Sequence, residues 1–105
     1  TWFGEKTNLH RVWDSDLVDF QGLSFTEYTK AINHVSKQEV LSLQSASLKD
    51  VVFESYGLCN KIYATGIKND DKLSYQYNFD WIETANQQLL KGGVRLAGVL
   101  NSIYK

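Results

Sequence analysis

A histidine and an aspartate four residues apart, His10 and Asp14, are the residues of this chain whose types and spacing could do chemistry. Side chains four apart on a helix lie on one face, one turn from each other. An imidazole nitrogen and a carboxylate oxygen placed in this way can bind one zinc ion. The spacing therefore predicts part of a metal site or, as the simpler alternative, an ion pair on a helix surface.

Two electrostatic considerations favour the metal-ligand alternative for this pair. A protonated histidine near a helix N-terminus meets the positive end of the helix dipole, and an acid that follows its cationic partner is in the weaker orientation. A neutral imidazole that binds a metal has neither disadvantage. However, a catalytic zinc takes three protein ligands and the motif offers two, His10 and Asp14, so both alternatives stay open at this point.

The other polar residues indicate structural roles, and we expect no catalytic residue among them. His34 is expected at a helix end, and Asp70 and Asp71 as solvated loop charges. Arg95 lies in a helix otherwise poor in charge, which favours a structural salt bridge or a helix-packing role. The single cysteine, Cys59, has apolar neighbours in the sequence and cannot form an internal disulfide, so we expect a small buried core residue.

Helical periodicity dominates the elements that must position these side chains. Ser24 with Glu27 and Ser36 with Glu39 have the spacing of N-terminal helix caps. The first predicted helix covers residues 8–20, is capped by Thr7 or Asn8 and is ended by Gly22. Two short helices follow, one with Phe25, Tyr28, Ile32 and Val35 on one face and one that carries Val40, Leu41 and Leu43. Two longer helices are predicted over residues 47–65 and 80–104, with a polar loop over 68–78 between them.

Two of these helices carry more detailed predictions. In residues 47–65 the apolar side includes Val51, Ser55 and Cys59, while Glu54 falls on the opposite, polar side. In residues 80–104 the apolar stripe includes Gly93, where a glycine either permits close approach of another backbone or simply kinks the helix. With no strand pattern, the fold class is all-α, and residues 1–105 form a single helical domain or part of one.

Composition sets the limits on function. The 105 residues include 11 Lys and Arg against 12 Asp and Glu, a net charge of −1, and 43% are hydrophobic. Such values are typical of globular chains and exclude disordered and fibrous classes. No apolar run approaches the roughly 18 residues of a membrane span. Binding duplex nucleic acid mainly through phosphates needs a clustered excess of basic residues, which a near-neutral chain lacks.

Three stretches of the sequence together resemble one known family. These are WFGEKTNLHRVWDSDLV, which contains His10 and Asp14, FESYGL around Glu54, and KGGVRLAGVLNSIY near the end. In this order and spacing they are similar to the C-terminal two-fifths of the zinc-dependent, single-strand-specific nucleases (the nuclease S-one and nuclease P-one family). The resemblance implies a helical bundle, the C-terminal part of the phospholipase C/nuclease-like fold.

The resemblance also implies what the motif residues do. His10 and Asp14 match the pair that holds one of the family's three zinc ions, completed in the family by a histidine from an upstream stretch. The remaining zinc ligands have no counterpart here. Trp2 does not substitute for the N-terminal tryptophan ligand of the family, because it matches an interior stretch. The chain would thus carry, at most, a partial site for one zinc.

The function implied is that of one portion of a zinc-dependent phosphodiesterase cleaving single-stranded DNA or RNA and 3′-nucleotides. Alone, this portion is expected to be inactive and, because a partial domain exposes apolar faces, to form homo-oligomers. No membrane partner is expected. Family members are secreted or periplasmic, which gives the expected localisation. The alternative is a non-catalytic helical module that acts by packing or self-association.

Overall fold

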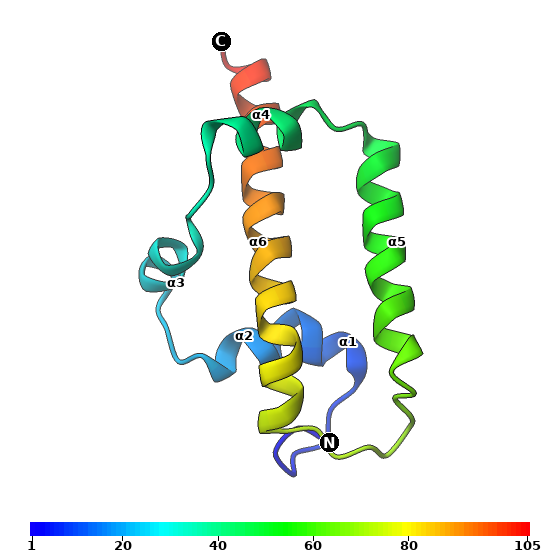
Figure 1. Cartoon of the computed structure of the whole chain (residues 1–105). Helices are drawn as coiled ribbons and strands as arrows, with labels where there is room; N and C mark the ends of the chain where they lie inside the picture. Colours follow the sequence, from blue (N-terminus) through cyan, green and yellow to red (C-terminus); the bar gives the residue numbers. More distant parts are fainter.

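The computed structural model describes residues 1–105 and contains helices but no strand, which confirms the all-α prediction (Figure 1). The first helical segment consists of two short α-helical pieces separated by a π-helical turn. The elements in order are α1 (Leu9–Arg11), the π-helical turn η1 (Val12–Asp16), α2 (Leu17–Phe20), α3 (Phe25–Ile32), α4 (Lys37–Ser45), α5 (Leu48–Ala64) and α6 (Tyr75–Ile103).

Helix α6 is the axis of the molecule, and the other elements lie around it. The segment from α1 to α2 lies at the N-terminal half of α6, and α4 lies across its C-terminal half (Figure 1). Helix α5 runs antiparallel to α6 on one side, so that α5 and the α1–η1 segment flank the same stretch of α6. This arrangement places the motif containing His10 near the N-terminal end of the long helix.

The predicted helix starts are confirmed because serine side chains cap them. The Ser24 hydroxyl accepts from the Glu27 amide while the Glu27 carboxylate accepts from the Ser24 amide, and the Ser36 hydroxyl accepts from the Glu39 amide. Such caps satisfy amides that have no partner inside the helix. Ser47 opens α5 in the same way, by accepting from the amide of Asp50.

Two of the predicted boundaries are wrong. The loop predicted over 68–78 extends too far, because α6 begins at Tyr75, not near residue 80. The burial of Tyr77 against other aromatic rings orders this polar stretch, an effect of tertiary packing that local composition does not reveal. Helix α3 ends at Ile32, so Val35 lies outside it, and Phe25, predicted on the same face as Tyr28, is exposed.

The core is small and lies under the His10 motif. Two side chains in the motif's own segment, Val12 and Leu17, are fully buried. They pack with Trp2, Tyr77 and Ala85 into one cluster. Because Val12 and Leu17 flank Asp14 in sequence, this cluster fixes the segment from α1 to α2 against α6.

Much of the chain's apolar surface is exposed. Only 7 of 105 residues are buried, and the accessible surface is 8087 Å². A compact monomer of 12.0 kDa exposes about 6,000 Å². The radius of gyration, 15.6 Å, likewise exceeds the roughly 13 Å of a compact chain of this length. No helix combines the length and the apolar character needed to cross a membrane.

Helix α5 contradicts two of the predictions. It contains no buried residue, and Cys59, predicted to be buried, is exposed. The face that points toward α6 includes Glu54, which the prediction placed on the opposite, polar side. The half-buried positions on α5 are Val51, Glu54, Leu58 and Ile62.

Of the two alternatives for Gly93, close approach of another backbone is wrong, since nothing lies within 4 Å of the position that a Cβ atom would take there. The close contact is instead at Gly98, where a Cβ atom would lie 2.7 Å from Cγ of Gln44 on α4. The Gln44 side chain donates to the carbonyl of Val94, one turn earlier, at 3.0 Å. Gly98 therefore makes room for the side chain that ties α4 to α6.

Candidate metal site

Local contacts fix the short helical segment that carries His10 and Asp14. The side chain of Asn8 accepts from the Arg11 amide and caps α1, as predicted for Thr7 or Asn8. The Thr7 hydroxyl donates to the carboxylate of Asp16 at 2.7 Å. A π-helical turn, η1, then carries Asp14. π-Helical turns are rare and often occur at functional sites, and no feature of the sequence predicted this one.

His10 and Asp14 are brought together as their spacing predicts. Nε2 of His10 lies 2.7 Å from Oδ2 of Asp14, and the two side chains are 85% and 64% exposed. A tetrahedral zinc ion bound to both atoms would hold them about 3.3 Å apart, so the pair needs to open by only about half an ångström. The donor types and their convergence therefore fit two ligands of one zinc ion.

This pair has no third protein ligand within the chain. No group of three or more His, Cys, Asp or Glu side chains is arranged to hold a metal ion. A structural or catalytic zinc takes three or four protein ligands. A zinc ion held by His10 and Asp14 would therefore need further protein ligands from outside these 105 residues.

The His10–Asp14 pair lies at a cleft between three elements. Leu9 and Trp13 join the pair on one wall, α5 forms the opposite wall, and α6 closes the cleft. Its volume is about 670 Å³. The side chains from the two long helices are Ser55, Leu58, Cys59, Ile62 and Tyr63 of α5 with Thr84 and Gln88 of α6. Ser55 and Cys59 belong to the predicted apolar side of this helix, but their place opposite His10 and Asp14 depends on where α5 lies, which could not be predicted.

Trp13 ties its wall of the cleft to α6. Its indole Nε1 donates to the hydroxyl of Tyr77 at 2.9 Å, and its ring meets Trp81 edge to face with centroids 5.7 Å apart. Burial raises the pKa of the Tyr77 hydroxyl above its ordinary value. The tyrosine therefore stays protonated and can donate a hydrogen bond while it accepts one from Trp13.

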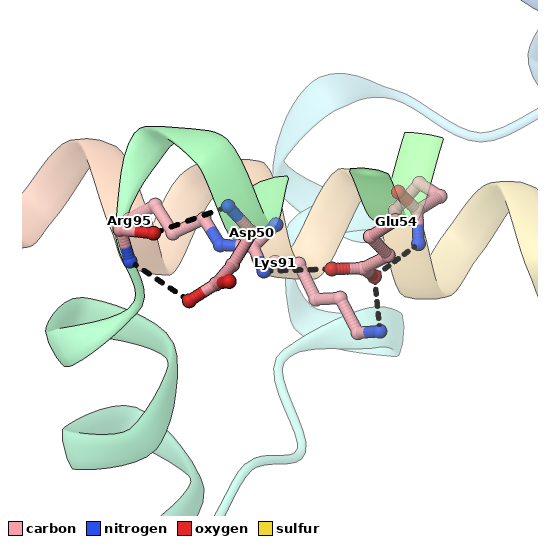
Figure 2. Close-up of polar contacts among 6 residues, drawn as sticks. Asp50, Glu54, Lys91 and Arg95 are labelled. Carbon is pink, nitrogen blue, oxygen red and sulfur yellow. Dashed lines mark hydrogen bonds and ion pairs between the residues drawn. The ribbon is translucent and has the colours of Figure 1, made fainter. Parts of the chain in front are cut away.

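A carboxylate on α5 makes the polar contacts between the two long helices (Figure 2). Oε1 of Glu54 accepts from Nε2 of Gln88 at 3.1 Å and from Nζ of Lys91 at 2.6 Å. Oε2 accepts from Nη2 of Arg95 at 2.8 Å. Hydrogen bonds from Lys91, then Arg95, then Gln88, lower the pKa of Glu54 to about 2. The salt-bridge role predicted for Arg95 is thus present.

The remaining candidates lie away from the cleft. His34 follows the C-terminal end of α3, where its amide donates to the carbonyl of Ile32. Asp71 lies in the loop before α6, and its carboxylate accepts from the amide of Lys68. Trp2 belongs to the buried cluster and pairs through its backbone with Leu73. None of these residues reaches the His10–Asp14 pair.

Comparison with known proteins decides the family. The family model described as S1/P1 nuclease matches residues 1–105, the whole chain. The chain belongs to the S1/P1 nuclease family. Among curated relatives of this family, Endonuclease 2 of Arabidopsis thaliana is 27% identical over 120 residues, and Endonuclease 3 of the same plant is 29% identical over 120 residues. Each alignment covers 98% of this chain and 40% of the relative.

The extent of these alignments matters for the site. The chain spans about two-fifths of the length of the S1/P1 relatives it matches. No solved structure gives a significant match. The predicted family resemblance is confirmed, while the remaining three-fifths of an S1/P1 nuclease has no counterpart among these 105 residues.

Proposed function

We propose that this chain is the C-terminal portion of a zinc-dependent phosphodiesterase that cleaves single-stranded DNA or RNA and 3′-nucleotides, and that it is inactive by itself. The observation that carries the proposal is the convergence of His10 Nε2 and Asp14 Oδ2 in a chain that matches the nuclease family from end to end. In this reading residues 1–105 are one part of a larger helical domain.

The chain's own residues would contribute binding and positioning. His10 and Asp14 would hold one of the family's three zinc ions, which when bound supplies positive charge to stabilise a phosphoryl group. The Thr7–Asp16 hydrogen bond and the buried Val12 keep the segment in place, so the two donor atoms stay on one face. Trp13, an aromatic ring in the same wall of the cleft, is suited to stacking against an unpaired base.

Activity assays test this proposal at two levels. With zinc present, the purified 105-residue chain is expected to leave heat-denatured DNA intact, because the water-activating ligands of the family lie outside it. In the longer protein that we propose, His10→Ala is expected to lower the rate of DNA cleavage by at least about tenfold. Cleavage of DNA by the purified chain alone, or full activity of the longer His10→Ala protein, would contradict the proposal.

The proposed localisation follows from the family. We infer that the complete protein is secreted or periplasmic, as members of this nuclease family generally are. Fractionation of the source cells tests this inference, since an exclusively cytosolic protein would contradict it.

A second candidate function, self-association, is favoured by the exposed surface of α5. Five large apolar side chains of this helix, each 59% to 80% exposed, have no cover in the chain: Leu48, Val52, Phe53, Tyr56 and Tyr63. The accessible surface of one chain exceeds that of a compact monomer by about 2,000 Å², well over the roughly 800 Å² that each partner buries in a stable protein interface. We propose that the isolated chain covers this face with a second copy.

Sedimentation velocity over a range of concentrations tests this second candidate. The wild-type chain is expected to form dimers or larger species at tens of micromolar, and Val52→Lys to shift it toward monomer because a charge is costly to bury. Asp19→Lys, at an exposed site on α2, is the control and should leave association unchanged. A wild-type chain that stays monomeric throughout would contradict this proposal.

A further inference from the structure

Helix α5 reaches its position without the apolar anchoring that fixes the rest of the chain. It has 17 residues and none is buried, whereas the segment from α1 to α2 has two fully buried side chains. A short link at Ala46 tethers one end of α5, and the loop from Thr65 to Ser74 connects the other end to α6. The half-buried Val51, Leu58 and Ile62 therefore give α5 only weak apolar packing where it forms a wall of the cleft.

The polar cluster in the middle of α5 supplies the missing anchor. Three donors spaced along one face of α6 converge on the two oxygens of Glu54: Gln88, Lys91 and Arg95. The Glu54 side chain is 28% exposed, and those of Lys91 and Arg95 are 32% and 19% exposed. Charge-assisted hydrogen bonds at such partly buried positions are stronger than those between exposed ions.

Arg95 has no alternative partner if Glu54 is removed. The Nε atom of Arg95 is buried and has no acceptor, and its Nη2 atom donates to Glu54. Loss of the carboxylate would leave two half-buried cations, those of Lys91 and Arg95, facing each other one turn apart on α6. Because an unpaired buried charge is unfavourable, the helices would separate to admit water.

The cluster is joined directly to the cleft that contains His10 and Asp14. Gln88 both donates to Glu54 and lines the cleft. Ser55, the residue after Glu54, and Leu58, one turn further along α5, line it as well. A movement of α5 at Glu54 therefore changes the width of the cleft opposite the ligand pair.

We propose that Glu54 is a positioning residue: by binding Gln88, Lys91 and Arg95 together it holds α5 at a fixed distance from α6 and so sets the width of the cleft beside His10 and Asp14. Its importance for catalysis rests on the proposed nuclease function, but its effect on the helix spacing does not. Glu54 does not touch the ligand pair and acts through the placement of the opposite wall.

Distance measurement by electron paramagnetic resonance tests this proposal without zinc or nucleic acid. One nitroxide label goes on Cys59, the chain's single cysteine, which is exposed on α5. A second goes on α6 at Gln87→Cys, also an exposed position. We expect a narrow distance distribution in the wild-type background and a longer, broader one with Glu54→Gln. Glu83→Gln, at an exposed carboxylate on the same helix as the donors, is the matched control and should change nothing.

Two further variants keep the test decisive if Glu54→Gln fails to fold. Gln88→Ala removes one neutral donor and leaves all three charges, and should broaden the distribution to a smaller extent. The charge-reversed double variant Glu54→Lys, Lys91→Glu should restore part of the narrow distribution. A wild-type distribution in both Glu54→Gln and Gln88→Ala, or a broad one in wild type itself, would overturn the proposal.

The outcome also separates this inference from the proposed nuclease function. If zinc fails to bind the chain while Glu54→Gln still lengthens the distance, the proposed zinc-ligand role of His10 and Asp14 fails and the positioning role of Glu54 stands. If zinc binds through His10 but the distance does not respond to Glu54, only the positioning role is overturned.

Discussion

Leu17→Ala is expected to lower the free energy of unfolding by about 3 kcal/mol, because it removes a fully buried side chain and leaves a cavity. The effect is large for this chain because only 7 of its 105 residues are buried, so each buried side chain contributes a large part of the stability. Leu17 directly follows η1, so its loss should also loosen the segment that carries His10 and Asp14. Urea unfolding followed by circular dichroism measures the change.

The matched control for Leu17 is the same substitution at an exposed position. Leu41 on α4 is 67% exposed, and Leu41→Ala should change the free energy of unfolding by less than about 0.5 kcal/mol. If both variants lose the same amount, the stability of the chain does not come from the cluster around Leu17, and the proposed anchoring of the ligand segment is wrong.

Glu54→Gln is expected to lower the free energy of unfolding by about 2 kcal/mol at pH 7 and by progressively less in acid. The pKa of Glu54 falls from 4.5 to about 2 in the folded chain. Each pKa unit corresponds to about 1.4 kcal/mol of stability. Because the side chain is partly solvated, the expected loss of stability is smaller than this conversion gives. Since the folded pKa is the lower one, the contribution is complete above pH 4.5 and is lost as the pH falls toward about 2.

Urea titrations of wild type and Glu54→Gln between pH 7 and pH 3 measure this dependence. The difference between the two proteins should stay constant from pH 7 to about pH 5 and shrink below it. Glu83→Gln, an exposed carboxylate on α6, should show no such trend. A difference between wild type and Glu54→Gln that does not depend on pH would show that the ionised carboxylate is not what stabilises the contact.

The features that depend on neighbours in sequence could be predicted from the sequence. Ser24, Ser36 and Ser47 begin helices because their side chains reach amides three residues ahead, a strictly local contact. The convergence of His10 and Asp14 is equally local, since a separation of four residues on a helix brings the two side chains together. These are the parts of the fold and site that the prediction described correctly.

The features that depend on how distant segments pack together could not be predicted from the sequence. The half-buried stripe on α5 contains Val51 of the predicted apolar side, but it also contains Leu58 and Glu54, which the prediction did not place there. A charged residue inside an apolar stripe was the available signal for a partly buried ion pair, but its partners Lys91 and Arg95 lie about forty residues away. The exposure of Cys59 follows from the same cause, because α5 stands apart from the core.

Zinc titration of the chelator-stripped chain tests the central proposal, that His10 and Asp14 are zinc ligands, most directly. Two ligands should supply about half the binding free energy of a four-ligand site, which corresponds to saturable binding of one ion per chain with a Kd between about 1 µM and 1 mM. His10→Ala should abolish this binding and leave the helical content intact, because the side chain is exposed. Binding by His10→Ala equal to that of wild type, or no saturable binding by either protein up to millimolar zinc, would contradict the proposal.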